Sequence, residues 1–184
     1  MSKVKSKEFL HSPTFSFSNK LIRVAWAITY TFFFKPSPVP FFSYRNWLLN
    51  VFGATVKKDA HVYPTVKIWL PANLTMQEGS ALGPNVNVYN QGNVSIGRNV
   101  IVSQGAHLCA STHDYNSRLH PLILAPILIE ANAWICADAF IGPGVTIAEG
   151  GVVGARAVAM KNIEAWGVYG GNPARKINER TWFD

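Results

Sequence analysis

Residues 129–153 of the chain read IEANAWICADAFIGPGVTIAEGGVV, a stretch in which an aliphatic residue returns at every sixth position. These residues are Ile129, Ile135, Ile141, Ile147 and Val153. Small or β-branched residues stand four places behind them, at Ala133, Ala139, Val145, Gly151 and Ala157. A period of six differs from the 3.6 of an amphipathic helix, and Gly and Pro are scattered through the segment. The pattern therefore indicates an array of short repeats.

The same period runs upstream through most of the chain. It recurs at Val56, Val62, Ile68, at Met76, Leu82, Val88, and at Ile96, Val102, Leu108. The phase breaks only after each third hexad, at the steps from 68 to 76, 88 to 96 and 108 to 129. Three hexads therefore predict one turn of a three-sided coil, with the aliphatic residue inward and Gly, Asn or Asp at the corners. Stacked coils pair their strands in parallel, about 4.8 Å apart. We expect about five coils.

The composition excludes several classes of protein. Of 184 residues 48% are hydrophobic, which argues against intrinsic disorder, and only 15% are charged. The net charge of +7 is concentrated in residues 1–50, which hold seven Lys or Arg and one Glu. Because the remainder has no basic stripe, binding to nucleic acid is not expected. Two cysteines exclude a disulfide scaffold and indicate a reducing, cytoplasmic compartment.

The ends of the chain lie outside the repeat. We expect a flexible basic tail over 1–20 and a helical cap over 21–53, with its second helix at 46–52, before the solenoid of 54–173. The apolar run 21–34 is too short to cross a bilayer. It either covers the end of the core or lies at the inner face of an anionic membrane as a weak peripheral contact. Residues 174–184 are expected to form a short C-terminal helix and tail. The flat, charge-poor walls suggest a homotrimer.

Several local motifs accompany the repeat. They are Phe52-Gly53-Ala54, Leu108-Cys109, Ser111-Thr112-His113-Asp114, Ala133-Trp134-Ile135, Pro143-Gly144-Val145 and Gly171-Asn172-Pro173-Ala174. With these motifs the chain resembles the hexapeptide-repeat acyltransferases, and among them the colanic-acid-type acetyltransferases and the maltose, galactoside and nodulation-factor O-acetyltransferases. The resemblance implies a left-handed parallel β-helix with a protruding loop at 114–126. It also implies transfer of acetyl from acetyl-CoA to a hydroxyl of a sugar or exopolysaccharide precursor, with no metal requirement.

The resemblance also implies roles for single residues on the acceptor side. His113 matches the family's catalytic histidine, a general base suited to neutral pH. Asn85 either contacts the acceptor or the developing oxyanion, or only fills a left-handed corner. Asn90 and Asp114 are weaker candidates for contact with the acceptor; related enzymes tend to have Asp in place of Asn90. Asp114 need not contact His113, and a backbone carbonyl is an alternative partner for the ring.

On the side of the coenzyme, the resemblance matches Trp134 to a tryptophan that lies along the pantetheine arm. The pantetheine slot is matched by Ala137, Ala155, Met160 and Lys161, and cations against the phosphates are matched by Arg175 and Lys176, with Arg180 as a further candidate. Cys109 and Cys136 are interpreted as small fillers and not as acyl carriers.

Two other functions use the same kind of solenoid. A zinc carbonic anhydrase needs three converging histidines, and His107 and His113 lie on successive faces of the coil. A non-catalytic scaffold could use the basic arm to sit on a membrane. The combination of His113, Trp134 and the Gly-Asn-Pro-Ala motif favours the acetyltransferase.

Overall fold

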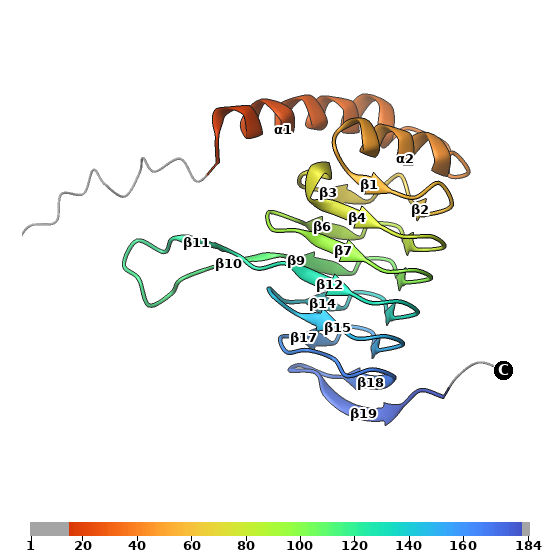
Figure 1. The fold of residues 1–184 in the computed structure, drawn as a ribbon, viewed down its shortest axis with the longest axis vertical. Helices are drawn as coiled ribbons and strands as arrows, with labels where there is room; N and C mark the ends of the chain where they lie inside the picture. The colour runs from red at the N-terminus through yellow and green to blue at the C-terminus, as the bar shows by residue number, and fades with distance from the viewer. Residues whose placement is uncertain (1–14, 182–184) are drawn as a thin grey trace, which may run out of the picture.

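The structure is a computed structural model that describes residues 15–181. Three parallel sheets run along one β-solenoid (Figure 1). Sheet A contains β1 (Thr55–Val56), β4 (Leu74–Met76), β7 (Val94–Ile96), β12 (Ile127–Ile129) and β15 (Thr146–Ile147). Sheet B contains β2 (His61–Val62), β5 (Ala81–Leu82), β8 (Ile101–Val102), β13 (Trp134–Ile135), β16 (Val152–Val153), β18 (Gly167–Gly170) and β19 (Arg175–Glu179). Sheet C contains β3 (Lys67–Ile68), β6 (Asn87–Tyr89), β9 (His107–Cys109), β14 (Phe140–Ile141) and β17 (Val158–Ala159).

The aliphatic residues that recur every six positions are the ones whose side chains point into the solenoid. In sheet B, Val102, Ile135 and Val153 are direct partners on three successive coils. Burying each such side chain contributes about 1.5–3 kcal/mol relative to leaving it exposed. Every inward aliphatic residue predicted from the hexads is buried, which confirms the parallel solenoid: Val56, Val62, Ile68, Met76, Leu82, Val88, Ile96, Val102, Leu108, Ile129, Ile135, Ile141, Ile147 and Val153.

The corners carry the residue types that the repeat predicts. Asn85, Asn132 and Asp138 have φ angles of 59°, 62° and 57°, in the left-handed region that short polar side chains tolerate. Gly105 also has a positive φ, and a Cβ there would lie 2.1 Å from a carboxylate oxygen of Asp138. A side chain at this position would therefore push the Asp138 carboxylate out of its place.

The number of coils is about six, not the five that we expected. Beyond the fifth coil, Ile163 makes a parallel bridge to Ile147 on sheet A. On sheet B, β18 continues the parallel stack on β16, where Val168 pairs with Val152. The sixth coil escaped the sequence pattern because it returns to both sheets after 16 residues instead of 18, which breaks the period of six.

The expected C-terminal helix is wrong. Residues 175–179 form β19, which pairs antiparallel with β18 after the turn at Gly171-Asn172-Pro173-Ala174. The edge of β18 would otherwise expose unpaired backbone groups, and pairing with β19 satisfies them. Since β19 is a highly charged strand, it also ends the stack with an edge that discourages further pairing.

The helical cap exists, with different boundaries. α1 (Phe17–Thr29) continues into the π-helical turn η2 (Tyr30–Phe34), and α2 spans Phe42–Val51. Ser16 caps α1 by accepting a hydrogen bond from the backbone N of Asn19. Residues 17–20, expected in the tail, are therefore helical, and 1–14 of that tail lie outside the described residues. Within residues 15–181, no helix has the length and apolarity needed to span a membrane.

The cap is fixed to the first coil by buried side chains. Trp26 on α1 is buried and donates from its indole N–H to the carbonyl of Ile68, at 2.8 Å. Arg45 on α2 is fully buried and donates from Nε to the carbonyl of Val62, at 2.6 Å. The cap thus closes one end of the core, which is the first of the two interpretations given for residues 21–34. A short 3-10 helix, η3 (Pro71–Asn73), fills the step between the first two coils.

The long insertion after the third coil is a β-hairpin. β10 (Ser111–His113) and β11 (Leu122–Leu124) pair antiparallel and project from the solenoid (Figure 1). The expected loop 114–126 therefore contains one of the two strands, and the hairpin begins three residues earlier. His113 stands at its last paired position, opposite Leu122.

Candidate active site

His113 is an exposed side chain on the projecting hairpin. Its Nδ1 lies 2.6 Å from the backbone carbonyl oxygen of His120, across the hairpin loop. A carbonyl only accepts hydrogen bonds, so Nδ1 carries the proton and donates it. In the neutral ring, Nε2 is then the unprotonated nitrogen that can receive a proton. The arrangement can therefore work as a general base.

Asp114 has a different partner. Its carboxylate oxygen Oδ1 accepts a hydrogen bond from the backbone N of Asn116, at 2.9 Å. Its own backbone N donates to the carbonyl of Pro121, which closes the loop. The partner of the His113 ring among the described residues is the carbonyl of His120, the alternative that the sequence left open.

Three candidate residues lie along the corner between sheets B and C, which we call corner BC (residues 83–86, 103–106, 136–139 and 154–157). Asn85 is exposed there on the second coil. Ala137 and Ala155 occupy equivalent places on the fourth and fifth coils, because Ile135 pairs with Val153. Both alanines reach the surface with small side chains. The positive φ of Asn85 accounts for an Asn at this corner, and its exposed amide stays available to a ligand.

Asn90 does not belong to the site, which corrects our expectation. Its side chain is 0% exposed. Its Oδ1 accepts hydrogen bonds from the backbone N of Trp69 and of Leu70, and its Nδ2 donates to the carbonyl of Leu70. The amide thus holds the chain where it leaves the first coil for η3. All of its bonds run to backbone, so it has no free group for an acceptor.

Trp134 lies on the outer face of sheet B and is 44% exposed. Its indole N–H donates to the hydroxyl of Ser103 on the preceding coil, at 2.9 Å, which fixes the orientation of the ring. Beside it is a hollow of about 310 Å³ that Arg180 also lines. Arg180 donates to the backbone carbonyls of Asn132 and Gly150.

A second hollow, of about 390 Å³, lies at the C-terminal end of the solenoid. It brings together four candidate residues: Met160, Lys161, Arg175 and Lys176. Lys176 contacts the carboxylates of Glu179 at 2.8 Å and Glu164 at 3.1 Å. The hydrogen bonds that Lys176 donates to Glu179 and, as a smaller cause, to Glu164 hold the pKa of its ammonium above its usual range. Its charge is already compensated, so Lys161 and Arg175 are the better candidates for binding phosphate.

The structure does not gather all candidates in one place of the chain. His113 leaves the solenoid at the corner between sheets C and A, which we call corner CA (residues 90–93, 110–126, 142–145 and 160–162). Asn85, Ala137 and Ala155 line corner BC, and Trp134 lies on sheet B. Sequence reasoning missed Ser103, and it left a backbone carbonyl open as the partner of His113 without identifying His120. The coil register could have indicated Ser103, since Val102 pairs with Ile135 beside Trp134; a backbone carbonyl leaves no sequence signal.

The other chemistries considered for the chain gain no support. Among residues 15–181, no three His, Cys, Asp or Glu side chains lie close enough to hold a metal ion. Cys109 and Cys136 are free and half-buried. Burial raises the pKa of the Cys136 thiol, which keeps it protonated and weakly nucleophilic.

Comparison with known proteins shows which class of protein this chain resembles. No family model matches the chain. The chain is 38% identical over 159 residues to a protein of Escherichia coli K12 named as the colanic acid biosynthesis acetyltransferase WcaF, covering 86% of this chain and 87% of the relative. It is 30% identical over 138 residues to the galactoside O-acetyltransferase of the same organism, covering 73% and 68%.

Solved structures of acetyltransferases share the fold of this chain. A hexapeptide-repeat acetyltransferase of Vibrio cholerae, complexed with acetyl coenzyme A, matches with a TM-score of 0.80 at 22% identity over 95% of each chain. A galactoside acetyltransferase in complex with coenzyme A matches with a TM-score of 0.75 at 26% identity, covering 90% and 84%. The class is thus the hexapeptide-repeat acetyltransferase. The chain belongs to that family, beside relatives named for colanic acid biosynthesis and for galactoside O-acetylation.

Proposed function

We propose that the protein is an acetyl-CoA-dependent O-acetyltransferase that acts on a hydroxyl of a sugar or exopolysaccharide precursor, with His113 as general base. The observation that carries the proposal is the bond from His113 Nδ1 to the carbonyl of His120, which leaves Nε2 free and exposed. Relatives named for colanic acid biosynthesis and galactoside O-acetylation support a saccharide acceptor.

The reaction needs one proton transfer in each direction. Nε2 of His113 accepts the proton of the acceptor hydroxyl as its oxygen attacks the thioester carbonyl carbon. The carbon–sulfur bond breaks, the ester remains on the acceptor, and the imidazolium returns its proton to the departing thiolate. Asn85 is proposed to donate an amide hydrogen bond to the oxyanion or to the acceptor.

The coenzyme is proposed to lie along the axis of the solenoid. Trp134 offers an oriented aromatic face to the pantetheine arm, and Ala137 with Ala155 leaves room for an extended chain at corner BC. Met160 lines the C-terminal hollow beside Lys161 and Arg175, which would meet the phosphates. Lys176 orders the rim of that hollow through its two carboxylate contacts.

We propose that the working assembly is a homotrimer with its sites between protomers. His113 and Asn85 stand at different corners of one chain, and sheet C separates them. Ile123 and Leu124 of the hairpin expose apolar surface, as do Ile101 and Leu128 on the walls. Such surface is typical of a protein interface. A neighbouring copy would bring its corner BC against the His113 hairpin.

We further propose that the protein works in the cytoplasm, in weak peripheral contact with the inner face of the membrane. The basic N-terminal region supports this location, since anionic lipids attract clustered cations.

The direct test is an acceptor screen with acetyl-CoA, in which free thiol and acetylated product are both measured. Simple sugars, nucleotide sugars and lipid-linked oligosaccharides form the panel. We expect thiol release in step with acetylated saccharide for at least one acceptor class. Thiol release that no hydroxyl acceptor stimulates, or acetylation of amines alone, would contradict the proposed function.

A further inference from the structure

The outer face of α1 is apolar although it points away from the protein. Trp26 is the buried contact of this helix with the solenoid. The opposite side exposes Phe17, Leu21, Val24 and Ile28. Because residues three, four and seven positions apart share one face of a helix, these four form a continuous apolar stripe. A soluble helix normally has the reverse pattern, with charge on its outer side.

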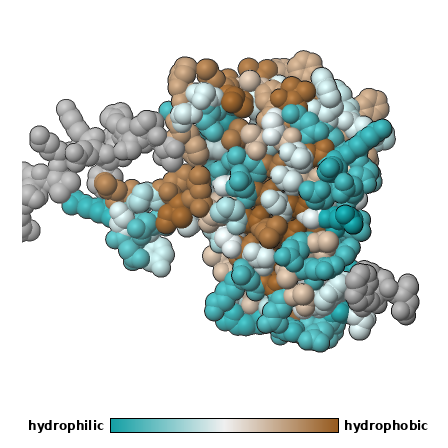
Figure 2. Space-filling view, in the orientation of Figure 1, coloured by the Kyte–Doolittle hydropathy of each residue, from teal (hydrophilic) through white to brown (hydrophobic). Residues whose placement is uncertain are grey.

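The apolar surface continues over the rest of the cap. η2, the linker that follows it and α2 add further exposed large side chains, and Figure 2 shows brown and tan residues over these helices at the top of the molecule. We call this end of the solenoid the cap surface; it comprises Phe17, Leu21, Val24, Ile28, Phe32, Phe33, Val39, Phe41, Trp47 and Val51. Exposed apolar residues concentrated to this degree mark an interaction surface.

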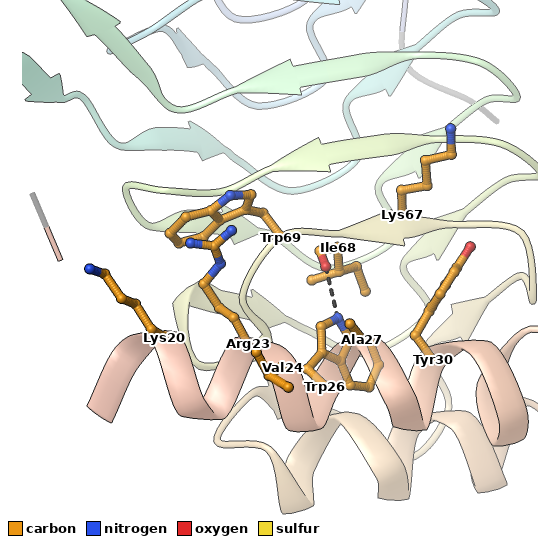
Figure 3. A pocket seen from close by; sticks show the side chains of 9 residues that line it. All are labelled: Lys20, Arg23, Val24, Trp26, Ala27, Tyr30, Lys67, Ile68 and Trp69. Carbon is orange, nitrogen blue, oxygen red and sulfur yellow. Dashed lines mark hydrogen bonds between the residues drawn. The ribbon is translucent and has the colours of Figure 1, made fainter. Parts of the chain in front are cut away.

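Cations border the cap surface and acids are missing from it. Residues 15–58 contain no Asp or Glu, whereas Lys20, Arg23 and Lys35 lie among the exposed apolar residues. On the flank of α1, a groove of about 480 Å³ runs between the helix and the first coil. Figure 3 shows Lys20, Arg23 and Trp69 toward one end of this groove and Lys67 with Tyr30 toward the other. The guanidinium of Arg23 lies 4.0 Å from the centre of the Trp69 ring, which holds it in place.

We propose that the cap surface docks on an anionic phospholipid membrane. The apolar stripe of α1 enters the boundary between head groups and acyl chains, while Lys20, Arg23 and Lys67 contact lipid phosphates from the flank groove. An interfacial helix has this combination of an apolar face and flanking cations. A second copy of the chain is a poorer occupant, because it would oppose cations to cations with no carboxylate between them. This inference rests on the proposed peripheral contact with the membrane and specifies the surface that makes the contact. Its test does not depend on acyl transfer.

The test is flotation of the full chain with vesicles of phosphatidylcholine alone or with about 30% phosphatidylglycerol. We expect binding to the anionic vesicles, weakened by salt, and little binding to phosphatidylcholine. Val24→Asp/Ile28→Asp should abolish binding, whereas Ile177→Asp, an exposed apolar residue at the other end, should not change it. Lys20→Gln/Lys67→Gln should weaken binding at least about tenfold, since each cation near the surface contributes about fivefold. The charge-matched control is Arg98→Gln/Arg156→Gln, at two exposed arginines on coils away from the cap, and it should bind like wild type.

Circular dichroism and light scattering accompany the flotation to verify folding and oligomeric state. The proposal is overturned if wild-type protein ignores anionic vesicles, or if both cap variants bind like wild type. It is also overturned if Val24→Asp/Ile28→Asp changes only the oligomeric state, which would assign the cap surface to self-association. Acetyl transfer to a soluble acceptor, measured on the same variants, separates failure of docking from failure of the proposed function.

Discussion

At the scale of single residues, the bond from His113 Nδ1 to the His120 carbonyl determines which ring nitrogen can act as a base. We expect His113→Ala to lower acetyl transfer by at least about 100-fold, the usual contribution of a positioned general base. The fold should be unaffected because the side chain is exposed and bonds only to the hairpin loop. His61→Gln is the matched control, since His61 is an exposed histidine on the first coil, away from the hairpin. Turnover of His113→Ala near that of the control would remove His113 from the mechanism.

A second residue makes stability depend on pH. His107 lies on sheet C between the rings of Tyr89 and Phe140, and burial lowers its pKa from 6.5. As the pH falls through 6.5, the unfolded chain binds this proton before the folded chain does. The contribution of His107 to the free energy of unfolding is therefore fully present above that pH and is lost as the pH falls below it. We expect the stability advantage of wild type over His107→Gln to shrink between about pH 8 and pH 5. Parallel unfolding curves for the two proteins over this range would contradict the assignment.

Residues differ in how far their roles could be predicted. The inward aliphatic residues were predictable because each hexad repeats the same local demand for an apolar side chain. Asn90 was not, since its role depends on a contact with Trp69 and Leu70 on the preceding coil. A polar residue at a corner has the same sequence signature whether it faces a ligand or is bonded to a backbone 20 residues away.

At the scale of elements, the cap depends on Arg45. Besides Val62, its guanidinium donates to the hydroxyl of Ser37 and to the carbonyls of Pro38 and Val39, so it ties the proline-rich linker to the first coil. Arg45→Met would leave buried acceptors without donors, at a cost of about 3 kcal/mol. We expect a fall in melting temperature of roughly 10 °C. Arg98→Met, at a largely exposed arginine, should melt like wild type; equal melting of all three proteins would show that the cap is not held by Arg45.

The elements at the chain ends were harder to predict than the coils. The segment 175–179 had no hexad signal, and its charged composition suits a surface helix. The open edge of β18 decides its conformation, and that edge exists only in the folded stack. The hairpin was expected as a loop for a related reason: β10 and β11 pair with each other outside the period that defines the coils.

At the scale of the whole molecule, the solenoid separates the candidate groups over two corners and one wall. His113 projects at corner CA, where Met160 and Lys161 lie two coils further on, whereas Asn85, Ala137 and Ala155 line corner BC. One flat wall cannot enclose a thioester, exclude water and surround an acceptor, but two walls from adjacent protomers can. The proposed homotrimer would then hold three equivalent sites, in which one chain supplies the base and its neighbour supplies the slot for the coenzyme.

Mixed trimers test this central claim most directly. One parent carries His113→Ala, and the other carries Ala137→Trp, which fills the slot at corner BC; each alone should be inactive. In random mixed trimers, about a quarter of the sites combine an intact His113 with an intact slot, so acetyl transfer should return to about a quarter of the wild-type rate. Absence of recovery in verified mixed trimers would contradict the account and place both halves of the site within one chain.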